Sequence, residues 1–110
     1  MKLKWAKHAR AVLFLLPLAA QADITPARQQ QLLHLLRQDC GSCHGLTLQG
    51  GLGPALTPQA LSGKSSDMLR AVILHGRPGT PMPPWQPFMS ETEAAWLVKQ
   101  LQAGVTADVR

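Results

Sequence analysis

Five consecutive residues carry the most reactive side chains of the chain: Cys40-Gly41-Ser42-Cys43-His44. Two cysteines separated by two residues and followed by a histidine have the spacing of covalent c-type haem attachment. The thiols of Cys40 and Cys43 can add to the two vinyl groups of a haem, and one turn of chain spans both points. The imidazole of His44 can then bind the iron if a hydrogen bond fixes its other nitrogen. The motif therefore predicts one covalently attached haem c with His44 as an axial ligand.

Other chemistries also use two cysteines at this spacing. In an oxidising compartment Cys40 and Cys43 can form a plain disulfide. A thioredoxin-like redox pair needs a strand before the motif and a mixed α/β chain, and neither pattern is visible. A zinc site needs four ligands, whereas the chain offers two cysteines and scattered histidines. The helical surroundings, an export signal and a later methionine favour haem attachment.

The second axial ligand is predicted in the segment Gly79-Thr80-Pro81-Met82-Pro83-Pro84-Trp85. The thioether of Met82 is a soft, weak iron ligand that raises the reduction potential. Prolines on both sides restrict the backbone, and so lower the entropy lost when the loop holds Met82 in place. Met68 and Met89 are instead predicted to fill the core, which is the ordinary role of a methionine.

Two histidines outside the motif are given simpler interpretations. His75 falls in the last turn of a predicted helix, where an imidazole can interact with free carbonyl groups. Its alternative role is that of a substitute ligand when Met82 leaves the iron. His34 lies opposite the leucine stripe of its helix and is predicted to be solvated.

Start signals and apolar spacing predict helices joined by Gly/Pro loops, and no stretch shows the sustained alternation of a strand. Thr and Ser caps, first-turn prolines and one capping box mark the helix starts. The expected elements are a first helix from Thr25-Pro26 to about Cys40, a turn at 59–61, a third helix from Ser65 or Ser66 to Gly76, and a last helix from Ser90 to Gly104. The fold class is therefore predicted to be all-α.

The first 22 residues have the order of a secretory signal. Lys2 to Arg10 is a positive stretch, residues 11–20 are mostly apolar, and Ala20-Gln21-Ala22 is a small-x-small cleavage site. The apolar run is too short for a bilayer, which takes about 20 residues. We expect cleavage after Ala22 and a periplasmic domain at 23–110, ordered at about 25–104, with no membrane attachment.

The positive net charge belongs mainly to this signal. The whole chain has 11 basic and 6 acidic residues, but the part after Ala22 has only one more basic residue than acidic residues. No clustered basic face remains, which argues against nucleic-acid binding. With no Tyr, two Phe and three Trp, the core is small, and a bound group is expected to complete it.

The order of these features resembles the class I cytochromes c over nearly all of residues 25–104. A first helix leads into the Cys40–His44 motif, and the segments that follow are Gly53-Pro54-Ala55-Leu56, the Met82 loop and a last helix bearing Trp96-Leu97. The resemblance implies a class I cytochrome c fold, with about four helices wrapped around one covalently attached haem.

The same resemblance implies roles for three further residues. The carbonyl group of Pro54 would accept a hydrogen bond from His44 Nδ1–H and so fix the imidazole ring. Trp96 would pack against the first helix. Trp85 would lie near a haem propionate and donate its indole N–H to it.

The short mature chain, the Gly50–Leu56 loop and the proline-rich ligand loop are most similar to small periplasmic cytochromes of the c-55X type. These are encoded with the haem c/haem d nitrite reductase of denitrifying bacteria. The resemblance implies single-electron transfer to that nitrite reductase. The alternative is electron acceptance from a haem d biosynthetic dehydrogenase during maturation of the reductase's cofactor. A haem sensor with a labile Met82 is a third, weaker interpretation.

An iron bound by both His44 and Met82 has no open position, so we expect an electron-transfer protein rather than an enzyme, working as a monomer. Its docking surface should lie where the haem edge emerges. Mostly apolar residues are candidates for this surface: Leu46, Leu48, Leu52, Pro83 and Pro84. Since the mature charge is near zero, docking is expected to be only mildly salt-sensitive.

Overall fold

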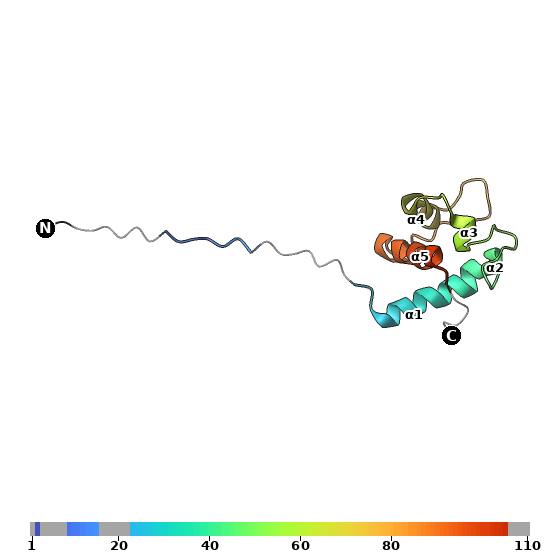
Figure 1. Ribbon diagram of the computed structural model, residues 1–110, viewed down its shortest axis with the longest axis horizontal. Helices are drawn as coiled ribbons and strands as arrows, with labels where there is room; N and C mark the ends of the chain where they lie inside the picture. The colour runs from blue at the N-terminus through green and yellow to red at the C-terminus, as the bar shows by residue number, and fades with distance from the viewer. Residues whose placement is uncertain (1, 3–8, 16–22, 106–110) are drawn as a thin grey trace.

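The structure is a computed structural model that describes residues 2, 9–15 and 23–105 (Figure 1). Within these ranges the chain is helical and contains no strand, so the predicted all-α class is confirmed. The elements are α1 (Pro26–Leu35), η1 (Leu36–Cys40), α2 (Gly41–His44), α3 (Pro58–Leu61), α4 (Ser66–His75) and α5 (Glu91–Ala103). None of these helices has the length and apolar character needed to cross a membrane. The predicted cleavage site at Ala20-Gln21-Ala22 lies outside the described residues.

The helix starts are set by side-chain caps, as the sequence predicts. Thr25, Thr57 and Ser65 each accept a hydrogen bond from the backbone N–H three residues later, at 3.2 Å. Ser90 and Glu93 form a reciprocal capping box at the start of α5, with distances of 3.1 and 3.0 Å. Each such cap gives a hydrogen-bond partner to a backbone amide that has none within the helix. This stabilises the folded protein by about 1 kcal/mol.

The first helix extends beyond its predicted end near Cys40. α1, η1 and α2 follow one another without a break, so the helix continues to His44. It stops there because Gly45 adopts a φ of +91°, and a Cβ at this position would lie 2.6 Å from the carbonyl oxygen of Gly50. η1 is a π-helix segment, whose turn is wider than an α-turn. The predicted end was too early because the chain stays helical through the motif as far as His44.

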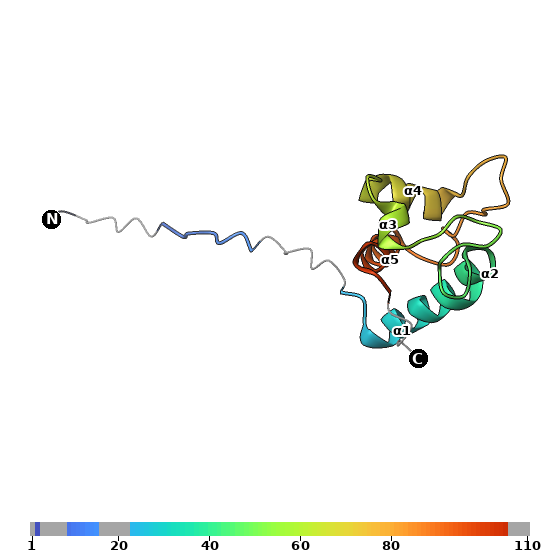
Figure 2. The same cartoon turned by 45° about the vertical axis from the view of Figure 1, so that its right-hand side comes forward.

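The core lies where α5 crosses the other helices. In both views α5 lies between α1 and α4, and it contacts α1, α3 and α4 (Figure 1 and Figure 2). The largest fully buried side chains are leucines and a valine from α1, η1 and α5: Leu32, Leu36, Leu97 and Val98. Burying each stabilises the fold by about 1.5–3 kcal/mol relative to leaving it exposed.

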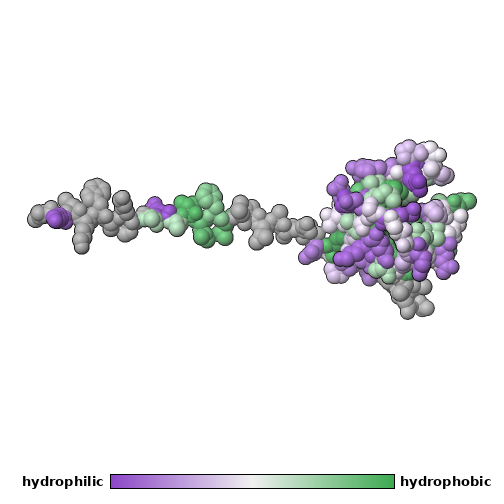
Figure 3. Space-filling model, turned by 45° about the horizontal axis from the view of Figure 1, so that its top comes forward, coloured by the Kyte–Doolittle hydropathy of each residue, from purple (hydrophilic) through white to green (hydrophobic). Residues whose placement is uncertain are grey.

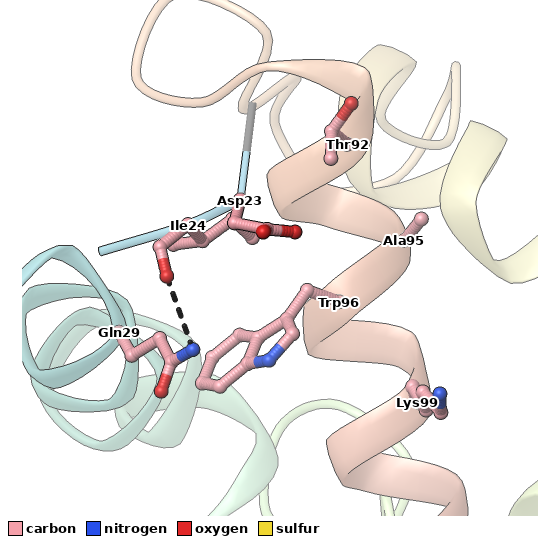
Figure 4. A pocket seen from close by; sticks show the side chains of 7 residues that line it. All are labelled: Asp23, Ile24, Gln29, Thr92, Ala95, Trp96 and Lys99. Carbon is pink, nitrogen blue, oxygen red and sulfur yellow. Dashed lines mark hydrogen bonds between the residues drawn. The ribbon is translucent and has the colours of Figure 1, made fainter. Parts of the chain in front are cut away.

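Trp96 lies on the edge of the α1–α5 contact. Its indole is partly buried against the core, and its ring lies between α5 and the Gln29 side chain of α1 (Figure 4). The Gln29 amide in turn donates a hydrogen bond to the carbonyl oxygen of Ile24 at 3.2 Å. The residue therefore occupies the position between the first and last helices that the resemblance implies.

Two of the predicted side-chain environments are wrong. Met68 was expected to fill the core, but 42% of its surface is exposed, whereas Met89 is buried as predicted. Leu48 was expected on an exposed docking surface, but it is a core residue with 7% of its surface exposed. Leu48 turns inward because it adopts a φ of +59°, a conformation that is rare outside glycine.

One ion pair ties α1 to the start of α5. Arg28 donates to both carboxylate oxygens of Glu93, at 2.8 and 3.0 Å, and its Nη2 also donates to the carbonyl oxygen of Phe88 at 2.8 Å. Because the carboxylate accepts the two hydrogen bonds from Arg28, the pKa of Glu93 is lowered from its ordinary value. The ionised form of Glu93 therefore favours the folded state.

We expect Glu93→Gln to lower the free energy of unfolding of the haem-loaded protein by about 1–2 kcal/mol at neutral pH. Since the pKa of Glu93 is lower in the folded state, this contribution is present above the unfolded pKa and is lost as pH falls through the folded pKa. Denaturant titrations across acidic pH measure the difference between the two proteins. Glu91→Gln, an exposed acid in the same turn, is the control, and an equal effect there would contradict the prediction.

Candidate functional site

A cavity of about 1010 Å³ opens between the first helix, α4 and the loops that join the helices. Cys40, Cys43 and His44 line it from one element, and Met82 lines it from the loop after α4. The two cysteines are free thiols. Pro54 and Trp85 also line this cavity. The structure thus brings all six site residues predicted from the sequence to one cavity.

The orientation of the His44 ring is fixed by the segment that follows the motif. Its Nδ1 lies 2.6 Å from the carbonyl oxygen of Pro54, and only 9% of the residue is exposed. Because a carbonyl oxygen can only accept, Nδ1 must carry the proton, and Nε2 keeps its lone pair for a ligand bond. The hydrogen bond therefore selects the tautomer that can bind a metal.

Gly53 lies directly against the His44 ring, a contact that the sequence did not predict. A Cβ added to Gly53 would lie 3.0 Å from both Cε1 and Nδ1 of His44. That is tight contact with a ring that has little room to move, so glycine lets the Pro54 backbone approach the imidazole. In the sequence, this contact is indicated only by the glycine that directly precedes Pro54. The spacing alone did not show that this glycine faces the His44 ring.

The two thiols differ in their surroundings. Cys43 is exposed, whereas Cys40 is partly buried beside the core. Burial, with a smaller contribution from the charge of Asp39, raises the pKa of Cys40 to about 11. The Cys40 thiol is therefore neutral at physiological pH, which suits its position against the apolar wall of the cavity.

Met82 is held in a short turn built by polar contacts on either side. The backbone N–H of Met82 donates to Oγ1 of Thr80 at 3.3 Å, and that hydroxyl donates to the carbonyl oxygen of Arg77 at 2.7 Å. The N–H of Arg77 donates to the carbonyl oxygen of Met82 at 3.2 Å. These hydrogen bonds join the two ends of the segment from Arg77 to Met82. The half-buried Met82 side chain lines the cavity.

The far end of this loop is attached to α4. The backbone N–H of Trp85 donates to the carbonyl oxygen of Ile73 at 3.0 Å, and the N–H of Gln86 donates to the carbonyl oxygen of Leu74 at 3.2 Å. Gly76 allows this close approach, since a Cβ there would lie 2.7 Å from the carbonyl oxygen of Met82. The loop is therefore positioned by backbone contacts as well as by its prolines.

Two other histidines of the described residues lie elsewhere. His75 is an exposed residue in the last turn of α4 and does not line the cavity, and its interaction with the helix carbonyls stays a prediction. His34 is exposed, as predicted. A second cavity, of about 490 Å³, lies over Trp96 between residues 23–29 and α5, and its lining residues carry no thiol, imidazole or thioether (Figure 4).

The donor set of the large cavity fits a haem c. Two thiols separated by two residues face the same space as an imidazole whose free nitrogen is oriented by Pro54, and a thioether lines the cavity from a separate loop. Apolar side chains from η1, α4 and α5 form its walls: Leu36, Leu69, Val72, Ile73, Leu97 and Leu101. A planar apolar ring would be buried there, and a porphyrin provides such a ring.

Two apolar residues of the predicted docking surface are strongly exposed. Leu46 is 71% exposed and Leu52 is 96% exposed, and both follow closely on the Cys40–His44 motif. Pro83 and Pro84, on the Met82 loop, are exposed as well. Figure 3 shows the hydrophobic residues of one face as small patches among hydrophilic ones. Apart from Leu48, the residues predicted to meet a partner are therefore accessible.

Comparison with protein families gives one match that covers most of the chain. Residues 27–99 match the family model of the cbb3-type cytochrome c oxidase subunit III. A cytochrome c55X of Pseudomonas aeruginosa is 58% identical over 101 residues, which cover 90% of this chain and 85% of that protein.

Solved structures of similar fold include a small cytochrome and a larger dehydrogenase. A c-type cytochrome named NirC has 60% sequence identity and a TM-score of 0.72, covering 74% of this chain and 95% of that one. The dihydro-heme d1 dehydrogenase NirN, solved in complex with DHE, has 40% identity and a TM-score of 0.61. That match covers 66% of this chain but only 16% of the dehydrogenase.

Proposed function

Because the chain belongs to the cytochrome c55X family of small c-type cytochromes, we propose that it carries single electrons through one covalently attached haem c. The observation that supports this most directly is the meeting of Cys40, Cys43, His44 and Met82 at a single cavity. When bound, the haem supplies reversible one-electron chemistry.

The residues of the chain have distinct roles in this proposal. Cys40 and Cys43 would form the thioether bonds, and Nε2 of His44 and the sulfur of Met82 would bind the iron. Pro54 keeps the proton on His44 Nδ1, and Trp85 donates to a haem propionate. Two protein ligands leave no position for a substrate, so the chain acts as an electron carrier and not as an enzyme.

The partner that we propose is the haem c/haem d nitrite reductase of denitrification, with which cytochromes of the c-55X type are associated. The exposed residues beside the motif and on the Met82 loop would dock to it: Leu46, Leu52, Pro83 and Pro84. The protein would work in the periplasm as a monomer after cleavage behind Ala22, with no membrane attachment and no contact with nucleic acid.

A second candidate function is favoured by one comparison. A dihydro-heme d1 dehydrogenase of Pseudomonas aeruginosa is 40% identical over 87 residues, although these cover only 17% of that enzyme. We therefore propose such a dehydrogenase, which contains a part similar to this chain, as the alternative source of its electrons. In this alternative the chain accepts electrons during maturation of the haem d cofactor.

Stopped-flow mixing of the reduced, haem-loaded protein with oxidised nitrite reductase tests the first function. We expect fast oxidation of the cytochrome coupled to nitrite turnover. Because the mature charge is near zero, its rate should change by less than about threefold between low and physiological salt. A steep fall with salt would contradict apolar docking.

Slow or absent transfer from a protein with a normal spectrum would contradict the donor role. The same experiment with the dehydrogenase and its substrate, in which the oxidised cytochrome is the acceptor, would then test maturation. Reduction of the cytochrome only by the complete mixture would establish the second function.

A further inference from the structure

Phe88 is a large apolar side chain that contacts the wall of the large cavity from outside. It is 60% exposed and does not line that cavity, but its ring packs against the indole of Trp85, which does. The two ring centroids are 5.6 Å apart and the ring planes are tilted by 54°, within the range that aromatic pairs prefer. The backbone N–H of Phe88 also donates to the carbonyl oxygen of Trp85 at 2.9 Å. Phe88 therefore contacts a cavity-lining residue through both its ring and its backbone.

The carbonyl group of Phe88 is held by a side chain of the first helix. Arg28 Nη2 donates to it at 2.8 Å, and the same guanidinium donates to both carboxylate oxygens of Glu93. Among the side chains of the described residues, Arg28 is the only one that hydrogen-bonds the segment 85–89. Two parallel hydrogen bonds fix the orientation of a guanidinium on a carboxylate. The ion pair therefore directs the remaining hydrogen bond of Arg28 toward Phe88.

We infer that Arg28 is a positioning residue for the cavity, because its hydrogen bond to Phe88 holds the phenyl ring against Trp85; this inference rests on the proposed function. Since most of Phe88 is exposed, burial contributes little to holding its ring. Arg28 lies in the first turn of α1, and the same continuous helix ends with the motif at residues 40–44. One helix thus carries the haem attachment motif at one end and positions a second wall of the cavity from the other.

Movement of Phe88 has a consequence inside the cavity. Without the hydrogen bond from Arg28, the phenyl ring is free to leave the indole of Trp85, and the indole loses its aromatic neighbour. A less fixed indole admits water to the haem on this side. Water stabilises the oxidised iron, which carries one more positive charge than the reduced iron, so the reduction potential should fall.

The position of Trp85 relative to the haem can be measured from its indole N–H signal in NMR spectra of the haem-loaded protein. Paramagnetic oxidised iron shifts this signal by an amount that depends on its distance and direction from the iron. The difference between the oxidised and reduced spectra therefore reports the position of the indole. The chain after Ala22 contains two tryptophans, and Trp96, which lines only the second cavity, is the internal reference. The spectrum of Trp85→Phe identifies the signal.

The variants to compare are Arg28→Gln, Phe88→Leu and the double variant. Phe88→Leu changes no charge, and Arg70→Gln, which breaks an exposed ion pair of α4, is the control for the charge lost in Arg28→Gln. We expect both single variants to change the oxidation-dependent shift of Trp85 and to leave that of Trp96 nearly unchanged. Both should lower the midpoint potential more than Arg70→Gln does. Because the two residues act through one contact, the double variant should stay close to the larger single effect.

A Trp85 signal that responds to Arg28→Gln no more than to Arg70→Gln would overturn the inference and leave Arg28 with a purely structural role. Fully additive effects in the double variant would also overturn it, since Arg28 would then not act through Phe88.

The proposed function fails on different measurements. A pyridine haemochrome spectrum of the wild type without thioether-bound haem would contradict the function and the inference together. Slow transfer to nitrite reductase, with the expected changes at Trp85, would contradict only the proposed partner.

Discussion

Replacing both Cys40 and Cys43 with alanine is expected to leave the purified chain largely unfolded. Without the haem, the apolar side chains that wall the cavity of about 1010 Å³ would face water, which costs about 25 cal/mol per Å² of apolar surface left exposed. Small domains are stable by only about 5–15 kcal/mol. The few aromatic residues of the chain cannot fill the space, so without the thioether bonds that retain the haem the native packing should be lost.

The amide region of an NMR spectrum measures this result, because an unfolded chain shows little chemical-shift dispersion. Ser42→Ala is the control within the same motif, since Ser42 is exposed and its hydroxyl donates to the carbonyl oxygen of Asp39 at 2.6 Å, with only a long contact of 4.0 Å to the Cys43 sulfur. That variant should keep its haem and its dispersed spectrum. A well-dispersed spectrum from the haem-free double alanine variant would show that the fold does not depend on the cofactor.

Met82→Ala is expected to have the second largest effect, and the effect should be electronic. Losing a thioether ligand removes its preference for ferrous iron and opens one coordination position. Since axial ligands spread haem potentials over roughly 0.8 V, we expect the potential to fall by roughly 100 mV or more. The variant should also bind small ligands such as cyanide or imidazole readily, whereas the wild type should resist them.

The chain provides a matched control in Met68→Ala. Met68 lines the same cavity from α4 and is 42% exposed, so it is the other methionine that could reach a group bound there. Its replacement should leave the potential and the ligand affinity close to those of the wild type. If Met68→Ala reproduced the changes and Met82→Ala did not, the assignment of the axial methionine would be reversed.

The helix ends are the part of the fold that the sequence predicts best. Caps such as Thr25 and the Ser90–Glu93 box act through hydrogen bonds to residues only three positions away, so local sequence contains all the information needed. The π-helix segment at Leu36–Cys40 is different, because its turn is wider than that of the α-helix that periodicity predicts. Leu48 is a similar case, since its inward turn depends on an unusual φ.

The candidate site also has residues that local sequence predicts and contacts that depend on tertiary packing. The Cys40–His44 motif and the proline-flanked Met82 could be found by spacing alone, since short motifs carry their own geometry. The contacts of Gly53 with the His44 ring and of Arg28 with Phe88 depend on how distant segments pack. The sequence also does not show where the Met68 side chain packs, because a methionine on a helix face can point to a core or to a cofactor cavity.

The backbone hydrogen bonds of the Met82 loop separate movement of the loop from movement of its side chain. Swinging the loop away from α4 would require the amides of Trp85 and Gln86 to lose their carbonyl partners on α4 together, whereas the bond between Arg77 and Met82 lies within the loop. Such local unfolding takes microseconds to seconds, whereas a side-chain rotamer change takes picoseconds to nanoseconds. Rotation of the Met82 side chain breaks none of these bonds, so at the proposed haem site the thioether could leave and return without displacing the backbone.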